Sequence, residues 1–250
     1  MPKLRALIFD VDGTLAETEE LHRISFNATF AEVGLDWDWD RALYRELLAV
    51  TGGKERIRYY IDEFDGSVDI PPEGIRVLHE RKTAIYAARM AEGALGPRPG
   101  ILRLIHEARQ AGVLCAIATT TSRPNIDALL QSAFAPDAVS WFAAIAAGDE
   151  VARKKPAPDV YVLALERLGL AADECLAIED SRNGLESARA AGLGCVITVS
   201  PYTEDQDFTA ALKIVAHMGD FETRNPTIEG GMVTLPMLQS WHSAGISRSA

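Results

Sequence analysis

The sequence predicts an α/β fold in which helices cover both faces of a parallel sheet and an all-helical unit is inserted after the first strand. Two observations carry this prediction. Short, nearly continuous apolar runs alternate with helical patterns from residue 98 to residue 216, as expected for strands covered on both faces. A further apolar run lies at residues 4–9, and residues 16–92 between the two regions show helical patterns without a convincing strand. The core is therefore expected to be Rossmann-like.

The predicted elements follow in order. After the first strand, helices are predicted at residues 17–33, 40–50, 54–64 and 72–90, with glycine-rich breaks between them. Beyond Arg98-Pro99-Gly100, helices are predicted at residues 101–110, 125–134, 158–168 and 185–191, and strands at residues 113–118, 142–147, 175–178, 195–199 and 213–216. We expect a core of residues 1–15 and 97–222, a helical cap of residues 16–96 and a C-terminal extension, residues 223–250, in which no element can be assigned.

Composition narrows the class of protein. A net charge of -11 argues against a nucleic-acid partner, which requires a basic surface. The first apolar run is too short for a signal peptide, and no stretch is long enough to span a bilayer, so we expect no membrane partner and a cytoplasmic protein, or a stromal one if a transit segment has been removed. Cys115, Cys175 and Cys195 lie far apart and are predicted to be buried free thiols. The oligomeric state is left open, with a monomer favoured.

Two carboxylates lie where the first predicted strand ends. Asp10 and Asp12 follow the apolar run directly and precede Gly13. One aspartate can attack phosphorus and form an aspartyl-phosphate; the second can protonate the leaving oxygen and then activate water, if its surroundings raise its pKa above its neighbour's. Acids this close repel, so a cation such as Mg²⁺ is expected beside them. A Ca²⁺ loop fits poorly because its glycine comes sixth, between helices, but a solvated turn stays open as an alternative.

Further polar residues follow the later strands. Thr119 and Thr120 follow one strand, Lys155 comes after the next, and Glu179 and Asp180 end a third. The carboxyl ends of parallel strands share one edge, so these residues are expected near Asp10. Thr119 can offer its hydroxyl and backbone N–H to phosphate, Lys155 positive charge, and Asp180 an oxygen ligand for Mg²⁺. Each alone can instead cap a helix or lie in a solvated turn, but that does not explain their joint order.

The order Asp-x-Asp-Gly-Thr, strand-Thr, Lys-Pro and Glu-Asp-Ser resembles the four motifs of the haloacid-dehalogenase-like superfamily, over residues 4–199. The resemblance implies a nucleophile, an acid/base that is also a metal ligand through its carbonyl, phosphate-binding groups and further Mg²⁺ ligands. By this resemblance Asp10 is the nucleophile and Asp12 the acid/base, and Thr119, Thr120 and Lys155 bind phosphate. The further Mg²⁺ ligands are Asp10, Asp180 and Glu179. The superfamily's dehalogenases lack the second acid, so the resemblance implies phosphate chemistry.

The sequences Lys-Pro-Ala-Pro-Asp at residues 155–159 and Glu-Asp-Ser-Arg-Asn-Gly at residues 179–184 resemble the subgroup that holds β-phosphoglucomutase, phosphoglycolate phosphatase and the CbbY proteins. The helical insertion then corresponds to that subgroup's cap. The resemblance implies that several residues face the substrate: Glu17, His22, Lys54, Lys82, Ser122 and Arg123. The basic ones would suit a second phosphate, although most Lys and Arg on a helical surface are simply solvated and His22 can be a packing residue.

Residues 7–22, 51–57 and 118–122 are most similar to the CbbY family of carbon-fixing bacteria, which acts on xylulose-1,5-bisphosphate. The resemblance therefore implies an Mg²⁺-dependent phosphatase whose partner is a small phosphorylated sugar. The motifs leave two alternatives open. One is a phosphomutase like β-phosphoglucomutase, which needs the same two acids, and the other is a non-catalytic module that binds phosphosugars.

Overall fold

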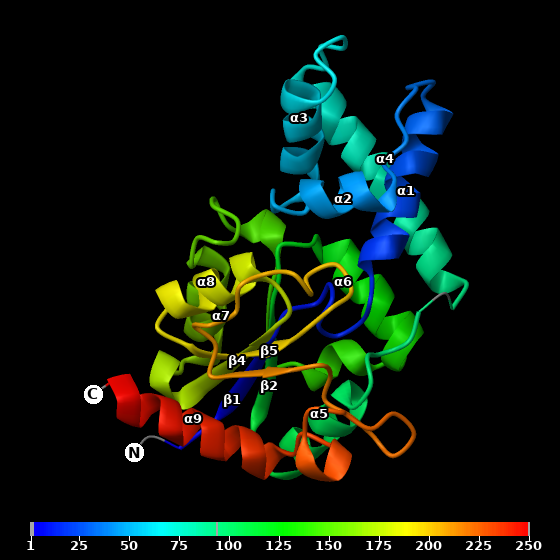
Figure 1. Ribbon diagram of the computed structural model, residues 1–250. Helices are drawn as coiled ribbons and strands as arrows, with labels where there is room; N and C mark the ends of the chain where they lie inside the picture. Colours follow the sequence, from blue (N-terminus) through cyan, green and yellow to red (C-terminus); the bar gives the residue numbers. More distant parts are fainter. Residues whose placement is uncertain (1–2, 94, 250) are drawn as a thin grey trace.

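Six parallel strands form one sheet, in the order β3-β2-β1-β4-β5-β6 (Figure 1). The computed structural model describes residues 3–93 and 95–249, so residues 1, 2, 94 and 250 of the predicted segments lie outside the described residues. The strands are β1 (Ala6–Phe9), β2 (Leu114–Ala118), β3 (Ala144–Ala146), β4 (Cys175–Glu179), β5 (Gly194–Thr198) and β6 (Lys213–Val215). The predicted fold class is confirmed, and β1 lies at the centre, where the strand order reverses.

Helices cover both faces of the sheet because successive side chains of each strand point to opposite sides. Leu7 and Phe9 of β1 belong to the apolar cluster on one face, whereas Ala6 and Ile8 belong to the cluster on the other. The first face is covered by α5 (Ile101–Gln110), α6 (Arg123–Leu129) and α9 (Leu235–Ser249), and the second by α7 (Asp159–Leu168) and α8 (Arg182–Ala190).

The helical insertion lies above the sheet in Figure 1. It consists of α1 (Glu19–Glu32), α2 (Arg41–Leu47), α3 (Gly53–Glu63) and α4 (Pro72–Ala91). These helices have an apolar core of their own, rich in aromatic side chains such as Phe26, Phe30, Trp37, Trp39 and Tyr44. None of the described helices combines the length and the hydropathy needed to cross a membrane.

The two connections between insertion and core run side by side. Ala16 forms an antiparallel bridge with Pro97, and the N–H of Arg98 donates to the carbonyl of Leu15 at 2.9 Å. The buried guanidinium of Arg98 also donates to backbone carbonyls of the core, including Thr198 O at 2.9 Å and Ala216 O at 3.1 Å. The base of the insertion is thus tied to the carboxyl edge of the sheet.

The C-terminal region, for which no element was predicted, folds onto the core. Its helix α9 packs beside α5, and Val233, Leu235 and Leu238 are buried in the cluster of that face. The N–H of Leu235 donates to Glu107 Oε2 at 3.1 Å, which satisfies a backbone donor at the helix start. The helical signal is weak in the sequence because serines and Gly245 interrupt it, and tertiary packing stabilises the helix instead.

Candidate active site

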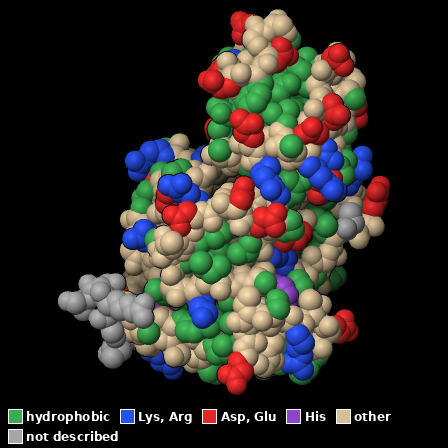
Figure 2. Space-filling model, in the orientation of Figure 1, with side chains coloured by type: hydrophobic (Ala, Val, Ile, Leu, Met, Phe, Trp, Pro, Cys, Tyr) green, Lys and Arg blue, Asp and Glu red, His purple; other side chains and the backbone are tan. Residues whose placement is uncertain are grey.

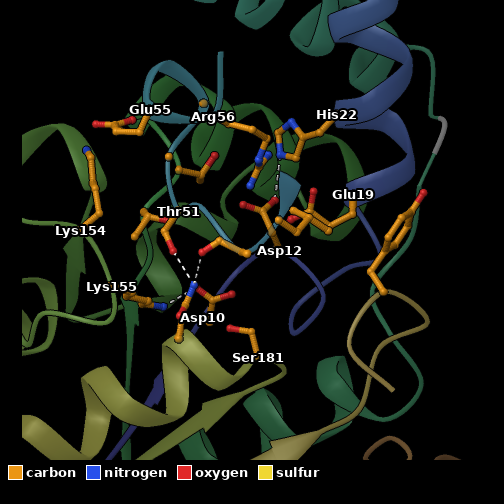
Figure 3. A pocket seen from close by; sticks show the side chains of 18 of the residues that line it. Asp10, Asp12, Glu19, His22, Thr51, Glu55, Arg56, Lys154, Lys155 and Ser181 are labelled. Atoms are coloured by element: carbon orange, nitrogen blue, oxygen red, sulfur yellow. Dashed lines mark hydrogen bonds and ion pairs between the residues drawn. The ribbon is translucent and has the colours of Figure 1, made fainter. Parts of the chain in front are cut away.

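A cavity of about 480 Å³ lies where the insertion meets the carboxyl edge of the sheet. The end of β1, the loops after β2, β3 and β4, and the helices α1, α3 and α4 all contribute to its lining. In Figure 3, Asp10 and Lys155 lie at the bottom of the cavity and His22 and Arg56 at its top. The ends of strands that are distant in the sequence therefore lie together at one edge of the sheet, as predicted.

Lys155 is the central cation of the cavity floor. Its Nζ lies 2.6 Å from Asp10 Oδ1 and 2.5 Å from Glu179 Oε1, and it donates to the carbonyl of Ala118 at 2.9 Å. Tyr161 donates its hydroxyl to the same Glu179 oxygen at 2.7 Å. Burial alone would lower the pKa of Lys155, but the two carboxylates outweigh it and raise the pKa above its ordinary value. Lys155 is therefore charged, and Glu179 holds it against Asp10.

Three carboxylates converge beside this lysine. Oxygens of Asp10, Glu179 and Asp180 all lie within 4.8 Å of one another, and the three residues are buried. Burial raises the pKa of Asp10 to about 7 even though Lys155 opposes the shift, and burial with the charges of Asp10 and Glu179 raises that of Asp180 well above its usual range. Gly13 makes this possible: its φ is +77°, and a Cβ there would lie 2.2 Å from Asp180 Oδ2.

These oxygens fit a divalent cation. Three acids face a single ammonium, so burial makes it unfavourable to ionise all three acids unless a further cation binds beside them. Carboxylate oxygens are the ligands that Mg²⁺ prefers. The Asp12 carboxylate is not a member of this cluster, and the contribution expected from its backbone carbonyl stays a prediction.

Asp12 instead belongs to a hydrogen-bonded chain that leads into the insertion. Its Oδ1 accepts from the hydroxyl of Thr18 and lies 3.0 Å from Nε2 of His22. The other ring nitrogen of His22 contacts Nζ of Lys82, which lies 4.8 Å from the ring centroid of Phe26. Burial and the charge of Lys82 lower the pKa of His22, which favours a neutral ring with its proton on Nε2.

The pKa values of the two aspartates differ, and that of Asp12 is the lower one. Burial would raise the pKa of Asp12, but its interactions with His22 and the hydrogen bond from Thr18 outweigh burial and lower it to about 2. Asp10 lacks such donors besides Lys155, and its pKa is about 7. Without substrate, Asp12 therefore has the lower pKa of the two, because Thr18 and His22 donate to its carboxylate, and the acid/base role of Asp12 stays a prediction.

Of the other predicted residues, Thr120, Ser122 and Lys54 line the cavity. Ser122 is 8% exposed, and its hydroxyl has no hydrogen-bond partner within residues 3–93 and 95–249. Thr119 is buried, and its N–H donates to the carbonyl of Ala146 at 3.1 Å, so only its hydroxyl is left for phosphate. That part of the prediction is wrong, because the backbone of Thr119 still pairs with β3.

Two predicted substrate residues do not line the cavity. Glu17 forms an ion pair with Arg98 at 2.6 Å, at the junction of insertion and core. Arg123 is exposed and pairs with Asp127, one turn further along α6, at 2.9 Å. A nearby ion-pair partner holds each side chain outside the cavity, so a contact of either residue with substrate stays a prediction.

Several lining residues were not predicted. They include Glu19, Thr51, His79, Asn125, Asn183, Tyr202 and Gln206. Asn125 carried a weak signal, because it lies only a few residues after the threonines that follow β2. Tyr202 and Gln206 lie in an irregular loop after β5 and carried none.

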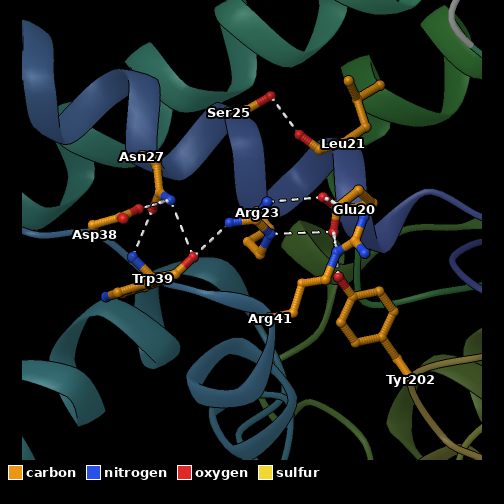
Figure 4. Close-up of polar contacts among 9 residues, drawn as sticks. All are labelled: Glu20, Leu21, Arg23, Ser25, Asn27, Asp38, Trp39, Arg41 and Tyr202. Atoms are coloured by element: carbon orange, nitrogen blue, oxygen red, sulfur yellow. Dashed lines mark hydrogen bonds and ion pairs between the residues drawn. The ribbon is translucent and has the colours of Figure 1, made fainter.

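Contacts between insertion and core close the cavity at its sides. Tyr202 of the core donates its hydroxyl to Glu20 of α1, which also pairs with Arg23 and Arg41 (Figure 4). On the other side, Asn183 Nδ2 donates to Thr51 Oγ1 at 2.9 Å and to a backbone carbonyl of the same loop. The insertion is therefore held over the carboxylates.

Comparison with known proteins agrees with this geometry. The model of the haloacid dehalogenase-like hydrolase family matches residues 4–192. The chain belongs to this family. It is 50% identical over 246 residues to protein CbbY of Cupriavidus necator, covering 96% of this chain and 97% of that protein. It is 54% identical to protein CbbY of Rhodobacter capsulatus over 211 residues, covering 84% and 91%.

Solved structures of family members are similar throughout. CbbY from Rhodobacter sphaeroides in complex with phosphate has a TM-score of 0.82 and 50% identity, covering 86% of this chain and 94% of that one. A mutant of CbbY from the same organism, in complex with xylulose-(1,5)bisphosphate, has the same TM-score and 49% identity over the same shares. The resemblance inferred from the motifs is confirmed, and the chain is an enzyme, a phosphoric monoester hydrolase.

Proposed function

We propose that this enzyme is an Mg²⁺-dependent phosphatase that removes phosphate from a sugar bisphosphate, xylulose-1,5-bisphosphate foremost, through an aspartyl-phosphate on Asp10. The observation that carries this is the pairing of Asp10 with Lys155 in a cavity that the helical insertion covers, with Lys54, Arg56 and Lys82 of the insertion in its lining. It is supported by the relative solved with xylulose-(1,5)bisphosphate, which shares 49% identity over 86% of this chain.

Asp10 is the nucleophile in this proposal. One oxygen of its carboxylate is held by Lys155, and the carboxylate attacks phosphorus while the bond between phosphorus and the sugar oxygen breaks. Lys155 and the hydroxyls of Thr119 and Thr120 stabilise the charge on the transferred group. Because Lys155 is also fixed by Glu179, its position does not depend on the substrate.

Asp12 is the acid and base. The anionic phosphate raises the pKa of the Asp12 carboxyl from its low value when it binds nearby, so that the carboxyl carries the proton which the leaving sugar oxygen needs. The resulting carboxylate then takes a proton from the water that attacks the aspartyl-phosphate. The bond between phosphorus and Asp10 breaks, phosphate leaves, and the carboxylate of Asp10 is regenerated. His22 and Thr18 keep the Asp12 carboxylate in one orientation throughout.

Asp10, Asp180 and the carbonyl of Asp12 would hold Mg²⁺, with Glu179 beside them. When bound, the ion supplies positive charge that neutralises the carboxylates and the transferred phosphate. The residues themselves bind and orient: Gly13 leaves room for Asp180, and Tyr161 and Lys155 fix Glu179.

Residues 16–96 act as a cap over a core of residues 1–15 and 97–222, to which the C-terminal helix adds a layer. Lys54 and Ser122 lie at the cavity wall and suit the sugar and its second phosphate. Figure 2 shows Lys and Arg side chains gathered where cap and core meet, whereas Asp and Glu prevail at the far end of the cap. A strongly anionic substrate is therefore attracted to the cavity mouth in an otherwise acidic protein.

Phosphate release with Mg²⁺ tests the proposal, across xylulose-1,5-bisphosphate, ribulose-1,5-bisphosphate, phosphoglycolate and β-glucose-1-phosphate. We expect the highest kcat/KM for xylulose-1,5-bisphosphate. Isomerisation of β-glucose-1-phosphate without net phosphate release would identify a phosphomutase instead. Binding of these compounds without any turnover would identify a phosphosugar-binding module.

A further inference from the structure

His79 of α4 is a cavity residue with no role in the chemistry described above. Its imidazole packs directly against the start of α3: a Cβ at Gly53 would lie 2.5 Å from both Cδ2 and Nε2 of the ring. Among the described residues, neither ring nitrogen has a hydrogen-bond partner. An imidazole that lines a polar cavity without a partner is available to a ligand.

Four elements of the fold each contribute a basic side chain near the ring of His79. Lys82 lies on the same helix, Lys54 on α3, His22 on α1 and Lys154 on the core loop before α7, and each of these groups disfavours a positive charge on His79 when it is itself protonated. Two acids face the same group of lysines. Asp149 of the core lies 3.7 Å from Lys54, and both Asp149 and Glu55 act on the charge of Lys154.

Lys54 and Lys154 are only weakly compensated by acids. The ion pair between Lys54 and Asp149 is long and partly exposed, and Lys154 donates to the carbonyl of Gly148, a neutral group. Figure 3 shows Lys154 and Glu55 on one side of the cavity, away from Asp10 and Lys155. This part of the cavity therefore favours an anion that is distinct from the phosphate at Asp10.

The protonation state of His79 depends on that anion. Burial, followed by the charges of Lys82 and Lys54, lowers its pKa to about 3, so the ring is neutral without ligand. An opposite charge within about 4–6 Å favours the charged form of a titratable group and can shift its pKa by roughly 1–3, and a phosphate dianion carries up to twice the charge of a carboxylate. A bound phosphate can thus reverse the shift and turn His79 into an additional cation.

We propose that His79 recognises the non-transferred phosphate of a bisphosphate substrate by taking up a proton as that phosphate binds, beside Lys54 and Lys154. The proposal rests on the proposed function, since it assumes a substrate with two phosphates. The preference for bisphosphates over monophosphates then depends on pH. Only a bisphosphate supplies the second anion, which stabilises the protonated form of His79 and lets the ring take up a proton from solvent.

The test compares kcat/KM for xylulose-1,5-bisphosphate with that for p-nitrophenyl phosphate, which has no second phosphate, between pH 6.0 and 8.5. The readout is the ratio of the two values, in which a general loss of activity cancels. In His79→Gln, which keeps an N–H donor but cannot be protonated, the ratio at pH 6.5 should fall about tenfold relative to wild type. At pH 8.5 the two enzymes should agree within about twofold.

The matched control is His106→Gln, an exposed histidine of α5 outside the cavity, whose ratio should follow wild type. Equal ratios for wild type and His79→Gln at every pH would overturn the inference. The proposed function fails separately, if wild-type enzyme releases phosphate from neither compound.

NMR of ¹³C-histidine in the full-length Asp10→Asn protein provides a second measurement, which does not require His79→Gln to fold. At pH 6.5, addition of xylulose-1,5-bisphosphate should convert one of the chain's five imidazoles from the neutral to the protonated state. If all five keep their state while the bisphosphate binds, the inference is wrong.

Discussion

Lys82 offers a prediction in which stability and activity change in opposite directions. The side chain is 3% exposed, and burial lowers its pKa from 10.5 to about 7. This shift corresponds to about 4–5 kcal/mol, the cost of keeping the ammonium charged in the fold. In Lys82→Met a side chain of similar length removes that cost. The substitution also leaves a nitrogen of His22 without its partner, which destabilises the fold by roughly 1–3 kcal/mol and so offsets part of the gain.

The expected result is a net gain of about 2 kcal/mol in the free energy of unfolding below pH 7, or roughly 4–8 °C in Tm. The gain is largest below pH 7, where wild-type Lys82 is charged in both the folded and the unfolded state. Above pH 7 folded wild type releases this proton before the unfolded chain does, so the gain shrinks as pH rises toward 10.5. At the same time kcat should fall about 10–100-fold, because Asp12 loses the chain of donors that orients it.

Calorimetry at pH 6.0 and pH 9.5 measures the stability, and phosphate release from xylulose-1,5-bisphosphate measures kcat. Lys54→Met is the matched control for stability: its lysine lies in the same cavity but is 42% exposed, so its Tm should stay within about 1–2 °C of wild type. A lower Tm for Lys82→Met at pH 6.0 would refute the reasoning about buried charge. An unchanged kcat would refute the role of the chain from Lys82 to Asp12.

Three further predictions concern the metal, the floor of the cavity and the cap. Removal of divalent cations with EDTA should abolish phosphate release and Mg²⁺ should restore it; activity that persists in EDTA would contradict a metal site at Asp10 and Asp180. Tyr161→Phe loses a donor to Glu179 at 2.7 Å, so urea unfolding should show a loss of about 1–3 kcal/mol, and an unchanged midpoint would mean that this bond is not stabilising. Tyr202→Phe loses the contact with Glu20 and should raise KM a few-fold; an unaltered KM would show that the contact does not help to close the cap.

The central part of the fold could be predicted because its signals are local and agree with one another. The apolar run ending at Asp10, and the later runs ending at Thr119 and Glu179, each behave as buried parallel strands whose ends share an edge. That rule alone brings Asp10, Lys155 and Glu179 together. It needs no knowledge of side-chain orientation.

The orientation of several site side chains could not be predicted, because each has more than one possible ion-pair or hydrogen-bond partner and the sequence does not show which one it contacts. Glu17 and Arg123 are polar residues near the site, but Arg98 and Asp127 offer each an ion pair outside the cavity. The low pKa of Asp12 results from donors that reach it only after α1 folds back over β1. The C-terminal helix is stabilised by tertiary contacts of side chains such as Leu238, which a weak local pattern does not reveal.

The most direct test of the central claim is whether Asp10 carries the phosphoryl group during turnover. Wild-type enzyme mixed with Mg²⁺ and xylulose-1,5-bisphosphate would be quenched in acid within one turnover, and the peptide that contains Asp10 analysed by mass spectrometry. The account predicts a phosphoryl adduct on Asp10 that forms and decays at the rate of phosphate release, and no adduct or turnover in Asp10→Asn. Turnover without an adduct, together with substantial activity of Asp10→Asn, would contradict it.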